Sequence, residues 1–198
     1  MHRRQLLASL ASSVVLSSPA FADKGPRQFN FTSVFSGQSS YYGSYGGKRI
    51  ISYRTNEAHG TIIVDTASRR LFYVLDATKV IQYGVGVGRQ GFTWSGIARV
   101  GNKEEWPAWH PPAEMIAREL RQYHRRLPDV MPGGPRNPLG ARALYLYEGH
   151  RDTLYRIHGT NDPSTIGKAI SSGCIRLVNE EIIDLYNRTP IGTKVIVL

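Results

Sequence analysis

Short apolar runs of β-branched and aromatic residues alternate with turn-forming segments through the middle of the chain. The runs at 62–64, 71–75 and 80–87 are separated by the polar segments DTASRR and DAT. Runs of this length and composition are typical of strands, and the polar segments between them are typical of turns. The pattern therefore predicts three successive strands in a meander.

The second half of the chain mixes helical and strand patterns. Residues 113–123 follow two prolines and place apolar side chains three to four positions apart, as a short helix does. The segments 144–147 and 153–157 are expected to pair as a hairpin, and 194–198 to close the chain as a strand.

A second helix is expected after Asn179. This residue type often caps a helix, Glu180 and Glu181 suit the first turn, and Pro190 ends the pattern. Together these elements predict a mostly β domain with two or three short helices.

The first 50 residues lack this patterning. Residues 1–22 combine a basic start, an apolar run and an Ala-Phe-Ala cleavage signature, so we interpret them as an export signal for either the general or the twin-arginine route. The apolar run is about half the ~20 residues that a membrane span needs, and no span is expected later in the chain. Residues 23–50, rich in Gly, Ser and Tyr, are expected to be a flexible tether before a folded domain at 51–198.

Composition and charge narrow the class of protein. The 198 residues are 41% hydrophobic and 20% charged, which excludes a disordered chain. The 25 Lys and Arg against 15 Asp and Glu give a net charge of +10, which favours acidic partners. No helix-turn-helix or basic aromatic pattern accompanies this charge, so no nucleic-acid partner is expected.

Two common cofactor motifs do not support cofactor binding. The segment 86–91 satisfies G-x-G-x-x-G, but the residues after it continue as turn and strand, where a dinucleotide site needs the start of a helix. The sequence contains no H-E-x-x-H or C-x-x-C pattern. We therefore expect neither a metal nor another cofactor.

The candidate chemistry lies between His158 and Arg176. Cys174 is the only cysteine, so it is either buried filler, an intermolecular link or a nucleophile. Small residues precede it in Ser171-Ser172-Gly173, and such a turn lets backbone N–H groups approach a substrate oxygen. His158 ends a predicted strand 16 residues upstream and is the candidate base for the thiol.

These segments resemble a known family. Ile157-His158-Gly159-Thr160, followed by SSGCIRL at 171–177 and by Asn179, is similar to the signature of the L,D-transpeptidases, the YkuD-like catalytic domain of bacterial cell-wall enzymes. The resemblance runs from about 61 to 198 and includes the segments 88–96, 106–112, 137–140 and 190–193.

The resemblance implies a YkuD-like β-sandwich or meander and a role for each matching residue. Cys174 would be the nucleophile and His158 its base, and the Gly159 carbonyl would orient the imidazole. Backbone N–H groups around Gly173 and Cys174 would hold the oxyanion.

The chain departs from the family pattern at two positions beside the thiol. Ser172 stands where many members have a second histidine, and Arg176 stands where they have asparagine. Arg176 would either bind a substrate carboxylate or form a structural salt bridge.

The implied reaction is acyl transfer on peptidoglycan stem peptides through a Cys174 thioester, in the periplasm and at the cell wall. The acceptor would be an amine of another stem, giving a 3-3 crosslink, or a lipoprotein lysine or a free D-amino acid. With water as acceptor the enzyme would be an exported carboxypeptidase or crosslink hydrolase. A carbapenem is expected to acylate Cys174. A thiol hydrolase with a different cleft and a noncatalytic wall-binding module are the alternatives from other classes.

Overall fold

The computed structural model describes residues 47–89 and 94–198. The expected export signal and most of the expected tether lie outside these ranges. No helix in the described part is long and apolar enough to cross a membrane.

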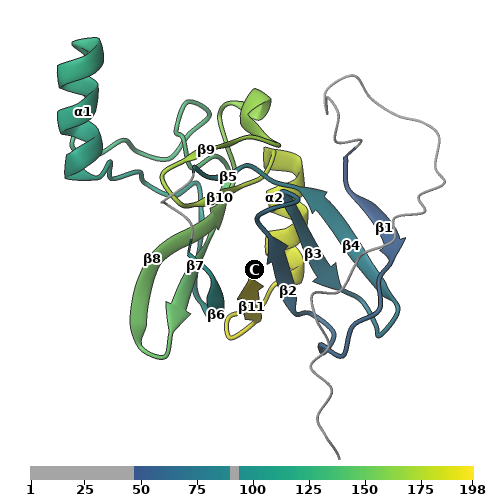
Figure 1. The fold of residues 1–198 in the computed structure, drawn as a ribbon. Coiled ribbons are helices and arrows are strands. Elements are labelled where there is room, and N and C mark those ends of the chain that lie inside the picture. Colours follow the sequence, from purple (N-terminus) through teal and green to yellow (C-terminus); the bar gives the residue numbers. More distant parts are fainter. Residues whose placement is uncertain (1–46, 90–93) are drawn as a thin grey trace, which may run out of the picture. The chain divides into compact units, whose positions relative to one another are not determined.

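A nine-stranded mixed sheet forms the centre of the domain, in the order β1-β4-β3-β2-β11-β6-β7-β8-β10 (Figure 1). Its strands are β1 (Arg49–Ser52), β2 (Ile62–Asp65), β3 (Arg70–Val74), β4 (Lys79–Gly84), β6 (Gly96–Glu105), β7 (Arg142–Glu148), β8 (Arg151–His158), β10 (Ile175–Arg176) and β11 (Lys194–Val197). A separate two-stranded ribbon pairs β5 (Val87–Gly88) with β9 (Ala169–Ser171). The helices are α1 (Ala113–Tyr123), α2 (Asn179–Arg188) and a 3-10 turn, η2 (Pro163–Thr165).

The predicted meander and hairpin are both present, but the third run, expected as one strand over 80–87, ends as β4 at Gly84, and Val87 belongs to β5 of the separate ribbon. Strands β2, β3 and β4 pair antiparallel in succession, and β7 pairs antiparallel with β8. The C-terminal strand β11 joins these two parts, since it runs parallel to β2 and antiparallel to β6. Strand β1 pairs with β4, so Arg49 and Ile50, which the sequence analysis assigns to the tether, belong to the sheet.

One hydrophobic core unites both halves of the sheet with α2. It contains side chains from β2 to β4, from β6 to β8, and from β10, α2 and β11. Ile182 and Leu185 are the fully buried apolar residues of α2, and Figure 1 shows this helix between the two halves of the sheet. Because α2 belongs to the core, its two ends are fixed relative to the strands.

The longest strand, β6, contains a bulge that interrupts the alternation of apolar and polar residues from which a strand is predicted. Its register against β7 shifts between Val100 and Asn102, and the residue between them is Gly101. A Cβ at Gly101 would lie 2.3 Å from the Tyr147 ring, so only glycine lets that ring lie over the strand.

Helix α1 forms where the prolines and the apolar spacing predict it, but none of its residues is buried. It stands clear of the sheet in Figure 1. The chain on either side of it is joined by a two-way backbone pair, from Trp109 N–H to Met131 O and from Met131 N–H to Trp109 O, each 2.8 Å. We call residues 110–130 the arm.

Candidate active site

Two adjacent parallel strands bring the candidate residues together. Strand β10 pairs parallel with β8, with Ile175 opposite Ile157 and Arg176 opposite His158. Cys174 directly precedes β10, and the Leu177 N–H donates to the His158 carbonyl at 2.9 Å. Residues 159–173, which connect His158 to Cys174, therefore form an excursion that returns to the strand from which it left.

The His158 ring is buried and oriented by the backbone. Its side chain is 4% exposed, and Nδ1 lies 2.6 Å from the Gly159 carbonyl oxygen. A carbonyl oxygen only accepts hydrogen bonds, so Nδ1 carries the proton and Nε2 keeps its lone pair. This is the tautomer that a general base needs.

The surroundings of His158 keep the imidazole neutral. Burial lowers its pKa from 6.5 to about 4, and the positive charges of Arg176 and Arg156 act in the same direction. Backbone hydrogen bonds with Gly159 and Leu139 partly oppose this shift. The ring is therefore unprotonated at neutral pH.

A serine hydroxyl closes the loop that carries Cys174. Ser171 Oγ donates to the Cys174 carbonyl at 2.7 Å and accepts from the Gly173 N–H at 3.2 Å. The Gly173 N–H is thus already engaged, whereas the Cys174 N–H makes no hydrogen bond within the part of the chain that the structure describes. Ser172 is exposed.

Cys174 is partly exposed, and its surroundings shift the pKa of its thiol in both directions. Burial raises its pKa, while a backbone hydrogen bond with Arg156 and the charges of Arg156 and Arg176 lower it. The raised pKa prevails, so the thiol keeps its proton at neutral pH.

Arg176 has a buried guanidinium with unused donors. Its Nε and Nη2 atoms are buried and find no hydrogen-bond partner among residues 47–89 and 94–198, and no carboxylate there pairs with it. Gly86 makes room for it, because a Cβ at Gly86 would lie 3.3 Å from both atoms and 2.8 Å from the Thr165 carbonyl oxygen. The charge of Asp162 stabilises this cation from a distance, but buried donors without a hydrogen-bond partner are costly, so the two free nitrogens favour an anionic ligand.

The Asn179 side chain, at the start of α2, packs closely against Gly159. Asn179 does not cap the helix as predicted: Val178 occupies the N-cap position without a side-chain bond, and Asn179 is the first helical residue. Its Oδ1 instead accepts from the Ala141 N–H at 2.9 Å. A Cβ at Gly140 or at Gly159 would lie 2.3 Å from the same oxygen.

Asn137 carries no role predicted from the sequence, although it lies in a segment that resembles the family. This residue is 1% exposed, and its Nδ2 donates to the carbonyls of Pro107, Met131 and Pro132 at 3.0–3.1 Å. Its Oδ1 accepts from the Leu139 N–H at 2.8 Å. Asn137 thus ties both ends of the arm to the segment whose backbone contacts His158.

Within the described residues, the site shows no arrangement typical of a metal or dinucleotide site. Within the described ranges, no three His, Cys, Asp or Glu side chains gather closely enough to bind a metal ion. The glycine-rich segment leads into strand β6, and the next helix, α1, begins only at residue 113.

Comparison with known proteins identifies the family. The family model of the L,D-transpeptidase catalytic domain, YkuD, matches residues 59–197. The probable L,D-transpeptidase YbiS of Escherichia coli K12 is 40% identical over 142 residues, which are 69% of this chain and 44% of that protein. The chain therefore spans less than half the length of this relative.

Solved structures share the fold. A Brucella melitensis protein described as a probable carnitine operon oxidoreductase is 44% identical, with a TM-score of 0.51, over 76% of this chain and 92% of that one. The Enterococcus faecium L,D-transpeptidase catalytic domain acylated by ertapenem is 19% identical, with a TM-score of 0.52, over 73% of this chain and all of that one. Its identity is low enough that it supports the fold alone. Since the family model covers most of the chain, the chain belongs to the YkuD family of L,D-transpeptidase catalytic domains.

Proposed function

We propose that this chain is a cysteine-dependent L,D-transpeptidase that acts on peptidoglycan stem peptides. The observation that supports the proposal is the parallel pairing of β8 with β10: the strand that follows Cys174 lies directly beside the strand that ends at His158, and the Nδ1 of His158 is held by the Gly159 carbonyl. Family membership supports the same reaction class.

The protonation states favour proton transfer during attack over a preformed thiolate. The pKa of the Cys174 thiol is raised and that of His158 is lowered, so both groups are neutral at pH 7. Cys174 Sγ attacks the carbonyl carbon of the third stem residue while His158 Nε2 accepts the thiol proton. The same proton then passes to the leaving amine of the terminal D-alanine as its C–N bond breaks and a thioester remains.

The second half of the reaction reverses these roles. An acceptor amine attacks the thioester carbonyl, His158 accepts the amine proton, and that proton returns to the departing sulfur. A stem amine gives a 3-3 crosslink, and a lipoprotein lysine or a D-amino acid gives the corresponding amide. Water as acceptor makes the protein a carboxypeptidase or crosslink hydrolase, which is the second candidate function.

Two features near the sulfur suit a charged intermediate and a charged substrate. The Cys174 N–H is unengaged within the described chain and is the first candidate for the oxyanion donor, an interaction worth about 2.7–4 kcal/mol in hydrolases. The Gly173 N–H would contribute only after leaving Ser171. The guanidinium of Arg176, of which Nε and Nη2 lack a hydrogen-bond partner in the described chain, is proposed to bind a carboxylate of the stem.

We further propose that the protein is exported by the signal at 1–22 and works at the cell wall in the periplasm, with 23–48 as a tether. A basic surface suits an acidic polymer, and the excess of Lys and Arg persists without the signal.

The test combines defined tetrapeptide stems with mass spectrometry of the products, with and without an acceptor amine. The wild-type chain should release D-alanine and form a transfer product, and ertapenem should add one acyl group at Cys174. Cys174→Ala should form neither product, and His158→Gln should be slower by about 10²–10⁴-fold. Ser172→Ala, which alters an exposed neighbour, should stay within a few-fold of wild type.

Thermal unfolding and circular dichroism check that each variant is folded. Turnover by folded Cys174→Ala would refute the nucleophile. Release of D-alanine with no transfer to any amine would leave the hydrolase as the function.

A further inference from the structure

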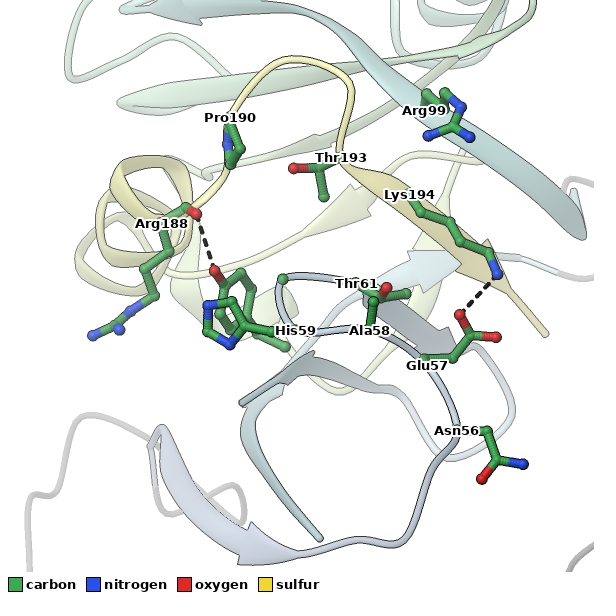
Figure 2. A pocket seen from close by; sticks show the side chains of 12 residues that line it. Asn56, Glu57, Ala58, His59, Thr61, Arg99, Arg188, Pro190, Thr193 and Lys194 are labelled. Atoms are coloured by element: carbon green, nitrogen blue, oxygen red, sulfur yellow. Dashed lines mark hydrogen bonds and ion pairs between the residues drawn. The ribbon is translucent and has the colours of Figure 1, made fainter. Parts of the chain in front are cut away.

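A hollow lies at the other end of α2 from the thiol. It has a volume of about 690 Å³ and is lined mainly by the segment 56–61, by Arg99 of β6, by Arg188 and Pro190 at the end of α2, and by Thr193 and Lys194 (Figure 2). None of the candidate catalytic residues lines it. We call it the basic hollow.

The basic hollow is separated from the thiol by the length of α2. Asn179 begins this helix beside Gly159, and Arg188 ends it at the hollow. Ten residues at about 1.5 Å each span roughly 15 Å. A stem peptide bound here would therefore not compete with the one at Cys174.

The charges around the basic hollow are unbalanced. Three cationic residues, Arg99, Arg188 and Lys194, line the hollow, and Glu57 is its single acidic residue. Figure 2 shows Glu57 paired with Lys194 on one side, and on the other the Tyr73 hydroxyl donates to the Arg188 backbone carbonyl at 3.0 Å. Arg188 pairs with Asp184 outside the hollow, which leaves Arg99 without a carboxylate partner in the described chain.

Arg99 is held toward Lys194 in spite of their like charges. The two residues are direct cross-strand partners between β6 and β11, so their side chains lie on the same face. Arg99 Nη1 donates to the Gly192 carbonyl at 3.1 Å, which fixes the guanidinium near the rim. Like charges placed opposite each other are destabilising, and Glu57 neutralises only Lys194, so an added anion beside Arg99 would relieve the repulsion.

The rest of the lining suits a peptide. Thr61 and Thr193 contribute hydroxyl groups, and Pro190 and the ring of Tyr73 contribute apolar surface. The His59 ring lies edge-on to Tyr73, with centroids 5.9 Å apart. The volume lies within the range of about 300–1,000 Å³ that small-ligand sites occupy.

We propose that the basic hollow is a second binding site for carboxylate-bearing stem peptides of the wall, which holds the polymer while Cys174 acts on another stem. The inference rests on the proposed function for the identity of the peptide. The hollow contributes polymer affinity and takes no part in the chemistry.

The test separates polymer binding from turnover. Purified sacculi are sedimented with the Cys174→Ala chain, so that binding is measured without reaction. Adding Arg99→Glu should weaken sedimentation about tenfold or more, and Arg99→Gln by a smaller factor. Arg151→Glu is the matched control, because it makes the same charge change at an exposed arginine outside the hollow. It should bind sacculi as Cys174→Ala alone does.

Two further measurements identify the ligand and distinguish a failure of this inference from a failure of the proposed function. When an amidase has removed the stems from the sacculi, Arg99→Glu and Arg151→Glu should bind them equally. With Cys174 intact, Arg99→Glu should turn over a short soluble tetrapeptide within twofold of wild type. Equal loss of binding in Arg99→Glu and Arg151→Glu would overturn the second site. Failure of wild type to turn over any stem would instead refute the proposed function, while the sedimentation result would still decide whether the hollow binds.

Discussion

The two ends of α2 hold their polar groups in opposite ways. At the N-terminal end, Asn179 touches two glycines, and the nearby polar groups of His158 and Arg176 are buried. At the C-terminal end, the ionic groups are partly exposed and mostly paired, as in Lys194 with Glu57. The N-terminal end is therefore constrained by close packing, whereas the C-terminal end is held by solvent-accessible ion pairs.

The two ends of α2 therefore tolerate different substitutions. Close packing leaves no space for an added atom. Burial makes the free energy of unfolding depend on the protonation state of each buried group. Partly exposed ion pairs are screened by water and contribute little individually. Large effects are thus expected at the thiol end and small ones at the basic hollow.

The largest effect is expected from Gly140→Ala. Gly140 has a φ of +64°, and a Cβ there would lie 2.3 Å from Asn179 Oδ1 and 2.4 Å from the Thr160 nitrogen. Overpacking and left-handed strain together should lower the free energy of unfolding by about 4 kcal/mol, measured by urea denaturation. Gly149→Ala is the matched control, because Gly149 has a φ of +59° with nothing within 4 Å, and it should cost about 1 kcal/mol. Equal costs at both positions would mean that the contact with Asn179 is not tight.

A smaller, pH-dependent effect is expected from Glu181→Gln. Glu181 is 4% exposed and its Oε1 lacks a partner in the described chain. Burial raises its pKa from 4.5 to about 7, although Lys48 partly opposes this. Its contribution to stability is therefore complete below pH 4.5 and is lost as the pH rises through 7.

The variant should consequently gain stability over wild type as the pH rises, by up to about 3 kcal/mol at pH 8. His158 acts with the opposite sign: its pKa is lowered to about 4, so its contribution is complete above pH 6.5 and is lost as the pH falls through 4. Urea denaturation of Glu181→Gln should thus show stability rising from pH 4 to 6.5, with Glu180→Gln, an exposed neighbour, following wild type. Parallel curves for all three proteins would contradict the buried-carboxyl interpretation.

The smallest effect is expected at the other end of α2. Glu57 and Lys194 are 30% and 34% exposed in their side chains and lie 2.7 Å apart. Glu57→Gln should therefore change the free energy of unfolding by no more than about 1 kcal/mol, and less in high salt, measured in the same assay. A loss above 2 kcal/mol would show that this end is as tightly constrained as the first.

The sequence predicted the elements whose patterns are long and regular. The β2–β4 meander, the β7–β8 hairpin, both α helices and β11 all carry such patterns and are confirmed. Strand β6 was not anticipated at its full length, because the bulge at Gly101 breaks the alternation and several of its residues are polar. Strands β5 and β10 contain two residues each, too few for any periodicity.

The candidate site was predictable only in part. Residue types and the family resemblance indicated His158 and Cys174, and the pairing of β8 with β10 explains how the chain brings their segments together. The prediction that Asn179 caps its helix is wrong. Its side chain could bond its own helix, but instead accepts from the Ala141 N–H, a partner 38 residues away. The contacts of Asn137, Gly86 and Glu181 likewise depend on neighbours distant in sequence, which local patterns do not register.

The hydrogen bonds that fix both ends of the arm have an evolutionary consequence. Asn137 and the Trp109–Met131 pair fasten both ends of the excursion, and no residue of α1 is buried. The intervening stretch can accordingly change in length or be exchanged as a cassette while the scaffold beneath keeps its shape. Related chains could thus diversify at this position at little cost in stability, and a protein engineer could insert a reporter there.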